Sequence, residues 1–98
     1  MTDPTPVQVV DNEDEGRFEA HTPAGLAELT YDRRDGKLFL LHTGVPPELE
    51  GQGIGGALVH AALEQARDRG HKVVPFCSFA RAYVDRHPEH AGLVDLPE

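Results

Sequence analysis

VPPELEGQGIGG, residues 45–56, decides the fold, because it joins a proline-containing loop to the glycine-rich start of a helix. Proline has no backbone N–H to donate, so residues 45–50 are expected to form a loop, neither helix nor inner strand. From Leu58 to Ala66, apolar side chains recur at helical spacing, and basic residues with Gly70 then end the helix. Glycines let the backbone approach a ligand, and the N-terminus of a helix favours an anion such as phosphate.

The residues on both sides of this stretch predict five strands and a second helix. Short apolar or alternating segments are separated by polar turns, and residues 37–43 are apolar on both faces, as in a central strand. Ser78 can cap the second helix, which Pro88 should stop near His87. The expected strands are residues 7–10, 17–21, 27–32, 37–43 and 72–76, and the second helix is residues 78–86.

The chain is short and acidic, with 98 residues, a net charge of -8 at pH 7 and 39% hydrophobic residues. This length fits a single domain, residues 1–98, with residues 1–6 as a flexible tail. Residues 1–50 carry 4 basic and 11 acidic side chains, against 5 and 6 in residues 51–98. Such a surface repels phosphate backbones, which argues against a nucleic-acid partner. A bound anion must therefore be held locally, and the glycine amides are the local donors.

The sequence also bears on the cellular setting. No signal peptide is recognisable, and no run reaches the roughly 18 apolar residues of a membrane helix, so we expect a soluble, cytoplasmic protein with no membrane partner. Cys77 is the only cysteine, which excludes an internal disulfide and a cysteine-based zinc site. His87 and His90 have no third ligand beside them, so we expect no metal and interpret them as part of a solvated helix end.

Three interpretations of the glycines can be compared on the sequence alone. Gly51, Gly53 and Gly56 fit the dinucleotide pattern G-x-G-x-x-G, but a proline loop separates them from the preceding strand and only one β-α-β unit is present. A Walker phosphate loop is excluded because no Gly-Lys-Ser/Thr follows. A glycine-rich turn that only precedes a helix stays open as the simplest alternative.

Residues 45–55 resemble the acetyl-CoA signature of the GNAT superfamily of N-acetyltransferases, in which V-x-P and three further residues precede Gly-x-Gly-x-Gly and a helix. Residues 77–79, Cys-Ser-Phe, and the pair His87-Pro88 are similar to a short acetyl-CoA-binding subfamily, and the resemblance covers about residues 16–94. It implies a minimal GNAT fold of the α+β (α/β) class. That fold has an approximately five-stranded, mostly antiparallel sheet with two helices, and strands four and five splay around the cofactor.

The resemblance implies acetyl-CoA as the cofactor. Its pyrophosphate would lie on the amides of residues 51–56 and its pantetheine would run along Val45, so the anion would be held without Lys or Arg. Glu50 is a departure, since relatives usually have Arg or Gln there. The short tip at residues 11–16 is another, because it leaves no room for the helices that wall the acceptor site in longer relatives. The residues expected to bind the cofactor are Thr43, Val45, Gly51, Gln52, Gly53, Ile54, Gly55, Gly56, Cys77, Phe79, Ala80 and Tyr83.

Acetyl transfer to an amine requires a base, a donor to the oxyanion and help for the leaving thiolate. His42 is the candidate base, since histidine titrates near neutral pH, although a histidine satisfied by hydrogen bonds at a strand end is the alternative. The resemblance implies that a main-chain N–H near residues 43–45 is the oxyanion donor. Cys77, at a helix start, is either a reactive thiol that could form a covalent acetyl intermediate or an inert buried one.

Other side chains have less defined roles. Tyr83 is a candidate acid for the leaving thiolate, but the usual tyrosine of relatives aligns with Val84, about 100° further around a helix. Arg81 and Arg86 are candidate contacts for the 3′-phosphate of CoA, with a solvated helix face as the alternative.

Two functional hypotheses follow from these inferences. The first is an N-acetyltransferase that transfers an acetyl group from acetyl-CoA to an amine of unknown identity, by direct attack with His42 as base. The second is a module that binds acetyl-CoA with little or no transfer. The acidic excess of residues 1–50 is most simply a solvated surface, and the functional alternative is that it attracts a small amine or a basic protein as acceptor. A second copy, in a homo-oligomer, could supply the missing wall of the acceptor site.

Overall fold

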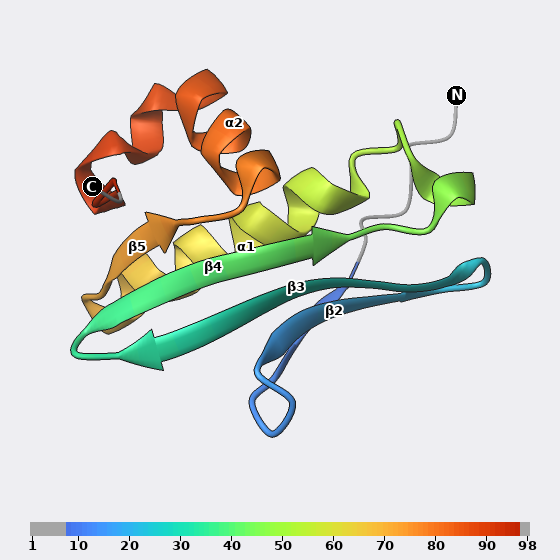
Figure 1. The fold of residues 1–98 in the computed structure, drawn as a ribbon, viewed down its shortest axis with the longest axis horizontal. Helices are drawn as coiled ribbons and strands as arrows, with labels where there is room; N and C mark the ends of the chain where they lie inside the picture. The colour runs from blue at the N-terminus through green and yellow to red at the C-terminus, as the bar shows by residue number, and fades with distance from the viewer. Residues whose placement is uncertain (1–7, 97–98) are drawn as a thin grey trace.

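The computed structural model describes residues 8–96, whose strands form one sheet in chain order (Figure 1). The first four strands pair antiparallel, and the fifth pairs parallel with the fourth because the helix α1 (Ile54–Arg69) carries the chain back between them. The predicted five-stranded, mostly antiparallel sheet with two α-helices is therefore confirmed. The strands are β1 (Val9–Asn12), β2 (Arg17–Thr22), β3 (Gly25–Arg34), β4 (Lys37–Gly44) and β5 (Lys72–Pro75).

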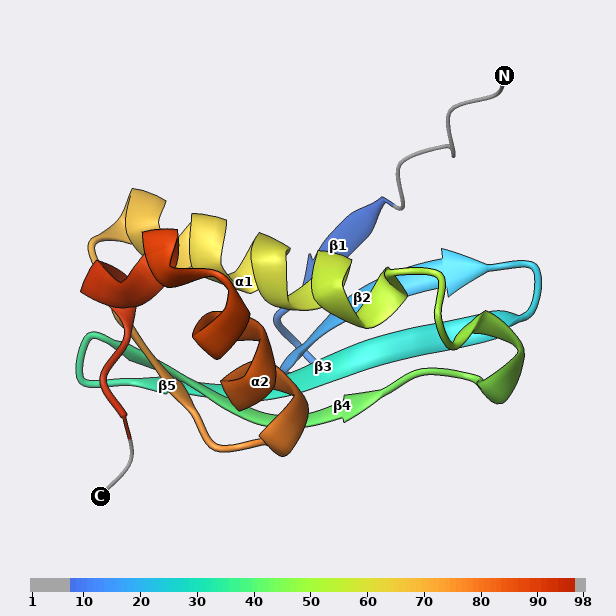
Figure 2. The same ribbon diagram turned by 90° about the horizontal axis from the view of Figure 1, so that it is seen from above.

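The alternation of β3 determines which face of the sheet is buried. Ala27, Leu29 and Tyr31 are buried, whereas the side chains between them are partly exposed. α1 packs on the buried face, where its Leu58 and Leu63 are inaccessible to solvent. Figure 2 shows α1 along one side of the strands, and no helix of residues 8–96 covers the other side.

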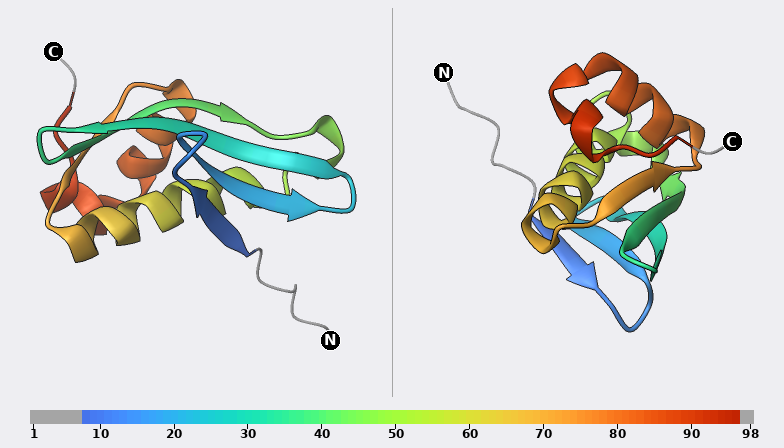
Figure 3. Two further views of the ribbon diagram at one scale, coloured as in Figure 1. Left: turned by 90° about the horizontal axis from the view of Figure 1, so that it is seen from below. Right: turned by 90° about the vertical axis from the view of Figure 1, so that its left-hand side faces the viewer.

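The second helix, α2 (Ser78–Arg86), packs against the beginning of α1 and buries Ala80 and Val84. It ends before Pro88, as predicted, and a 3-10 helix, η2 (Pro88–Leu93), follows directly. Figure 3 shows η2 beside the second half of α1, so the C-terminal part of the chain returns to the core.

Some predicted boundaries are corrected. Residues 45–50 contain a 3-10 helix, η1 (Pro47–Leu49). Proline is tolerated at the first helical position because the N–H of that residue has no partner within the helix. β3 is longer than predicted because its pairing continues on both sides, with Thr22 at one end and Lys37 at the other. β5 ends one residue early, at Pro75. The predicted tail, residues 1–6, and the start of the first strand at Val7 lie outside the described residues.

β4 and β5 separate where β5 ends. Their pairing ends at Leu40 and Pro75, and the N–H groups of Phe76 and Cys77 both donate to the Leu40 carbonyl. β4 continues to Gly44 beyond this point, after an irregularity in its pairing with β3. The two strands therefore diverge, as predicted for strands four and five.

Candidate functional site

A cleft of about 820 Å³ opens where β4 runs past the end of β5. Its walls come from the end of β4, from the glycine-rich loop with the first turn of α1, and from α2 with the residue that follows it. Segments far apart in the sequence thus meet around one cavity. The lining residues are His42, Thr43, Gly44, Val45, Leu49, Glu50, Gly51, Gly53, Ile54, Gly55, Gly56, Phe79, Tyr83, Arg86 and His87.

The N-terminus of α1 faces this cleft without a cap of its own. Gly53 precedes the helix with a φ of 80°, a conformation that glycine adopts without strain. No side chain caps the helix, and its first turn has no acidic residue. Ala57 donates the first helical hydrogen bond, so the N–H groups of residues 54–56 point outward with no helical acceptor. The positive end of the helix dipole is therefore available to an anion.

Two aromatic rings of α2 pack on this first turn. A Cβ added to Gly55 would lie 2.6 Å from Cζ of Phe79, so only a glycine allows the observed contact. A Cβ on Gly56 would lie 3.4 Å from Cε2 of Tyr83, which is a tight but permissible distance. The glycines therefore bring α2 close to the N-terminus of α1, and the rings form an apolar wall of the cleft.

Tyr83 faces the cleft, whereas Val84 is buried in the core. The tyrosine ring stacks on His87 with 3.9 Å between ring centroids, and the Nδ1–H of His87 donates to the Tyr83 carbonyl at 2.8 Å. Burial, with the nearby charges of Glu89 and Glu64, raises the pKa of Tyr83 above its ordinary value. Tyr83 therefore keeps its proton through the physiological range and can act as a hydrogen-bond donor.

His42 is exposed at the end of β4 and lines the mouth of the cleft. Its backbone carbonyl accepts a hydrogen bond from Oγ1 of Thr30 at 3.3 Å, and its ring makes no hydrogen bond to residues 8–96. A Cβ on Gly44 would lie 3.7 Å from Nε2 of His42 and 3.7 Å from Cγ of Glu28. The imidazole and the Glu28 side chain therefore flank the bare backbone of Gly44.

Three of the residues predicted to bind a cofactor lie outside the cleft lining. Cys77 is half-buried, where its Sγ accepts from the N–H of Ala80 and lies 3.4 Å from Oγ1 of Thr43. Ala80 belongs to the core. Gln52 is exposed and donates to the carbonyl of Glu48. The other predicted residues, from Thr43 to Tyr83, are brought together around the cleft.

Some lining residues were absent from the predicted set. Arg86 reaches the cleft and Arg81 does not, so only one of the two candidate phosphate contacts is placed there. The prediction that His87 belongs to a solvated helix end is corrected, because His87 is half-buried against Tyr83. Glu50, which is exposed, also lines the cleft, so an acidic residue belongs to its wall. The lining is completed by Gly44 and by Leu49, whose apolar side chain in a polar loop is a signal for burial.

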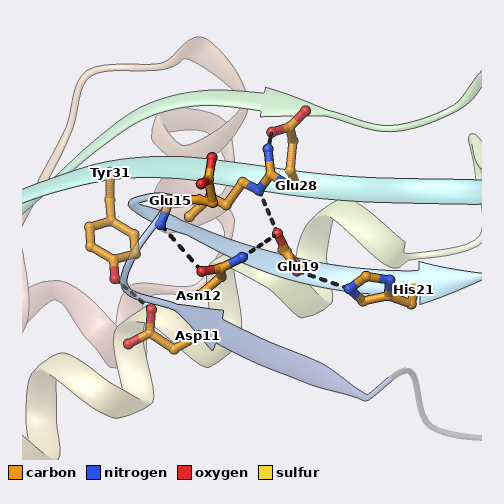
Figure 4. A network of polar contacts seen from close by, with 8 residues as sticks. Asp11, Asn12, Glu15, Glu19, His21, Glu28 and Tyr31 are labelled. Carbon is orange, nitrogen blue, oxygen red and sulfur yellow. Dashed lines mark hydrogen bonds and ion pairs between the residues drawn. The ribbon is translucent and has the colours of Figure 1, made fainter.

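A polar network lies on the uncovered face of the sheet, next to Glu28 (Figure 4). The Glu19 side chain is only 7% exposed and accepts hydrogen bonds from Arg17, His21 and Asn12. These donors, Arg17 first, lower the pKa of Glu19 from 4.5 to about 2. Arg17 also reaches Oε1 of Glu28, with 3.3 Å between the atoms.

Two negative findings concern residues 8–96. Among them, no group of three or more His, Cys, Asp or Glu side chains is placed to hold a metal ion. None of the helices formed by these residues is both long enough and apolar enough to cross a membrane.

Comparison with known proteins adds an independent observation. Residues 17–93 match a family described as GCN5-related N-acetyl-transferase. The chain is similar to a GCN5-like protein from Staphylococcus aureus, named as a candidate N-acetyltransferase, with 30% identity and a TM-score of 0.73 over 97% of this chain and 94% of that one. It also resembles nourseothricin acetyltransferase, with 19% identity and a TM-score of 0.50 over 86% of this chain and 66% of that one. The second likeness shows the fold alone.

Proposed function

The chain belongs to the GCN5-related N-acetyltransferase family, and from this membership we propose that it binds acetyl-CoA in the cleft and transfers the acetyl group to an amine. The open N-terminus of α1 is the observation that carries the proposal. Its free N–H groups and positive dipole end suit the pyrophosphate of CoA, and an apolar wall formed by Phe79 and Tyr83 lies next to them.

The charge of the protein is compatible with this ligand. The chain has a formal net charge of -8, yet an anion at the start of α1 would be held by backbone N–H groups and would need no basic side chain. Arg86 adds a positive charge to the cleft, and Glu50 adds a negative one. The binding of phosphate would therefore depend on the helix N-terminus more than on ion pairs.

The residues around the cleft have distinct roles in this proposal. Acetyl-CoA, when bound, supplies an activated acetyl thioester. His42, exposed beside the cleft, accepts the proton that the attacking amine releases. Main-chain N–H groups near residues 43–45 stabilise the negative charge that develops on the carbonyl oxygen. Tyr83, which keeps its proton because of burial, donates to the departing sulfur.

Direct attack by the amine is favoured over a covalent route through Cys77. The thiol lies outside the cleft lining, and its Sγ is already engaged with the N–H of Ala80 and the hydroxyl of Thr43. We therefore assign Cys77 a structural role, as the cap of α2 behind the wall of the cleft.

A module that binds acetyl-CoA without transfer is the alternative, and the hairpin between β1 and β2 favours it. Only the residues between Asn12 and Arg17 join these strands, so no helix stands there to wall an acceptor site. In either case, we propose that residues 1–98 act as one domain. For the transferase, we propose a small amine or a basic protein as the acceptor.

Calorimetric titration with acetyl-CoA tests the shared premise of both candidates, and NAD serves as the control ligand. We expect saturable heat with acetyl-CoA and none with NAD, whereas the opposite result would exclude the proposal. A Gly56→Asp variant places a carboxylate in the first turn of α1, where it stabilises the helix but repels phosphate. We expect this variant to remain folded and to lose at least about tenfold in affinity, while Gly92→Asp, outside the cleft, binds normally.

Thiol release over a panel of amines then separates the two candidates. A transferase releases CoA faster when the right amine is present. A flat trace with every amine, despite tight binding of acetyl-CoA, would favour the binding module.

A further inference from the structure

Glu28 has a position that suggests a role in choosing the acceptor, and this inference rests on the proposed acetyl transfer. Its side chain lies on the uncovered face of the sheet, in register with Gly44 of β4. A Cβ on Gly44 would lie 4.0 Å from Oε2 of Glu28 and 3.7 Å from Nε2 of His42. Gly44 and His42 line the cleft and Glu28 does not, so the carboxylate stands just outside its mouth, beside the proposed base.

The two oxygens of Glu28 are used differently. Oε1 pairs with Arg17 at 3.3 Å, and Oε2 makes no hydrogen bond or ion pair to residues 8–96. The Glu28 side chain is 33% exposed, so Oε2 is free to bind a group that arrives from solvent. The absence of a side chain on Gly44 leaves space for that group between Oε2 and the imidazole of His42.

The charge of the neighbouring network leaves Glu28 only partly compensated. Glu19 is almost buried and takes the shortest contact to Arg17, together with donors from His21 and Asn12. One guanidinium therefore serves two carboxylates, of which Glu28 is the more exposed and has the longer contact (Figure 4). The result is an excess negative charge at the mouth of the cleft, which attracts a cation.

We infer that Glu28 binds the acceptor as an alkylammonium ion and so selects amines that are cationic at neutral pH over neutral amines. An alkylamine arrives protonated, because the ordinary pKa of a lysine-like amine is about 10.4. Moving such a cation out of bulk water costs free energy unless a carboxylate pairs with it. Glu28 holds the ammonium next to His42, which passes one proton from it to solvent before the nitrogen attacks and then accepts the second proton that the attack releases. Glu28 is thus a specificity-determining residue for the acceptor.

The test uses 1,4-diaminobutane as the cationic probe and 1,4-butanediol as its neutral counterpart, with binding followed by NMR of the full chain. We expect the diamine, and not the diol, to shift the signals of His42 and Gly44. Glu28→Gln, which keeps the shape but removes the charge, should weaken diamine binding about 10- to 100-fold. Glu28→Asp should retain part of it, and Asp14→Asn, at the exposed tip of the first hairpin, should behave as wild type. Equal diamine binding by the wild type and Glu28→Gln, or no binding by either, would overturn the inference.

Two further measurements distinguish this inference from the proposed function. Calorimetry with acetyl-CoA should give the same affinity for Glu28→Gln and wild type, because the carboxylate lies away from the N-terminus of α1. In the thiol-release assay, Glu28→Gln should raise KM for the diamine and leave KM for acetyl-CoA unchanged. Diamine binding without thiol release for any amine of the panel would reject acetyl transfer and keep the amine site. Thiol release with an unchanged KM for the diamine would reject the role of Glu28 and keep the transfer.

Discussion

The ring of Phe79 packs directly on the backbone of Gly55, so closely that a Cβ on residue 55 would lie 2.6 Å from Cζ. This contact joins α2 to the first turn of α1 and forms part of the cleft wall. Gly51 and Gly53 are needed for another reason, because their φ angles are 83° and 80° and nothing lies within 4 Å of a Cβ placed on them. Glycine is thus required in this segment for two different structural reasons, a close contact at residue 55 and a positive φ at residues 51 and 53.

A double-mutant cycle on Gly55 and Phe79 checks this relationship. With Phe79 present, Gly55→Ala should lower the free energy of unfolding by about 1 kcal/mol, because the ring must move away from its contact. In a Phe79→Ala background, the same change should raise it by about 0.5–1 kcal/mol, because alanine is the better helix former. Urea unfolding of the four proteins measures both values. An equal change in the two backgrounds would show that residues 55 and 79 are not coupled and would contradict this prediction.

Glu50 offers a prediction about affinity. It lines the cleft beside the start of α1, where its negative charge opposes a bound phosphate. Glu50→Gln should therefore bind acetyl-CoA about two- to fivefold more tightly at low salt, which corresponds to about 0.3–1 kcal/mol for a charge at a helix N-terminus. Calorimetry at two salt concentrations measures the gain, which should shrink at high salt. Glu48→Gln, outside the lining, is the matched control and should leave the affinity unchanged.

The sequence predicted most of the fold because its signals are local. The alternation in residues 27–32, the prolines before the glycines and Pro88 after the second helix each act within a few residues. The first and the last gave the correct element, and the prolines correctly excluded a strand at residues 45–50. The 3-10 helix at Pro47–Leu49 is not predicted from the sequence, because prolines usually exclude a helix. Proline is nevertheless compatible with the first position of a helix.

The candidate site was harder to predict because it depends on contacts between distant segments. Nothing near Gly55 in the sequence reveals that Phe79 packs on it. Likewise, the resemblance places the usual tyrosine of relatives at Val84 and leaves the role of Tyr83 open, whereas the structure turns Tyr83 toward the cleft. Glu28 was only one of many acidic residues until the sheet register placed it beside Gly44.

The role of His42 as base gives a kinetic prediction. His42→Gln should lower kcat about 100- to 10,000-fold, the range typical of losing a general base, and leave the affinity for acetyl-CoA nearly unchanged. His60→Gln is the matched control, because His60 is exposed on α1 and outside the cleft lining. Thiol release with a saturating amine measures kcat. A His42→Gln enzyme with the wild-type rate would remove this assignment.

Cys77 is expected to act as a helix cap. Cys77→Ala removes the acceptor for the N–H of Ala80 and should lower the free energy of unfolding by about 0.5–2 kcal/mol, whereas Cys77→Ser supplies a hydroxyl and should not. Both variants should release thiol within about threefold of the wild-type rate, because a capping residue takes no part in the transfer. A threefold change in rate corresponds to less than about 1 kcal/mol of activation free energy. Loss of turnover in both, with Cys77→Ser fully folded, would instead support the covalent route.

Glu19 should make stability depend on pH. Its pKa is about 2 in the folded protein, against 4.5 ordinarily, because Arg17, His21 and Asn12 donate to its carboxylate. A carboxyl group whose pKa is lowered by folding stabilises the native state above its ordinary pKa, and this contribution disappears as pH falls toward the folded value. The stability advantage of wild type over Glu19→Gln should therefore be complete above about pH 5 and should decrease steadily between about pH 5 and pH 2.

Thermal unfolding of both proteins at a series of pH values measures this advantage directly. Asp14→Asn is the control, because its side chain is exposed at the hairpin tip and makes no ion pair to residues 8–96. The difference in stability between Asp14→Asn and wild type should stay nearly constant over the same pH range. Arg17→Gln should behave like Glu19→Gln, since it removes the largest cause of the lowered pKa of Glu19. A wild-type advantage that is equal at pH 6 and pH 2.5 would mean that Glu19 contributes through shape alone, and the polar network would then have no part in the acid sensitivity of the fold.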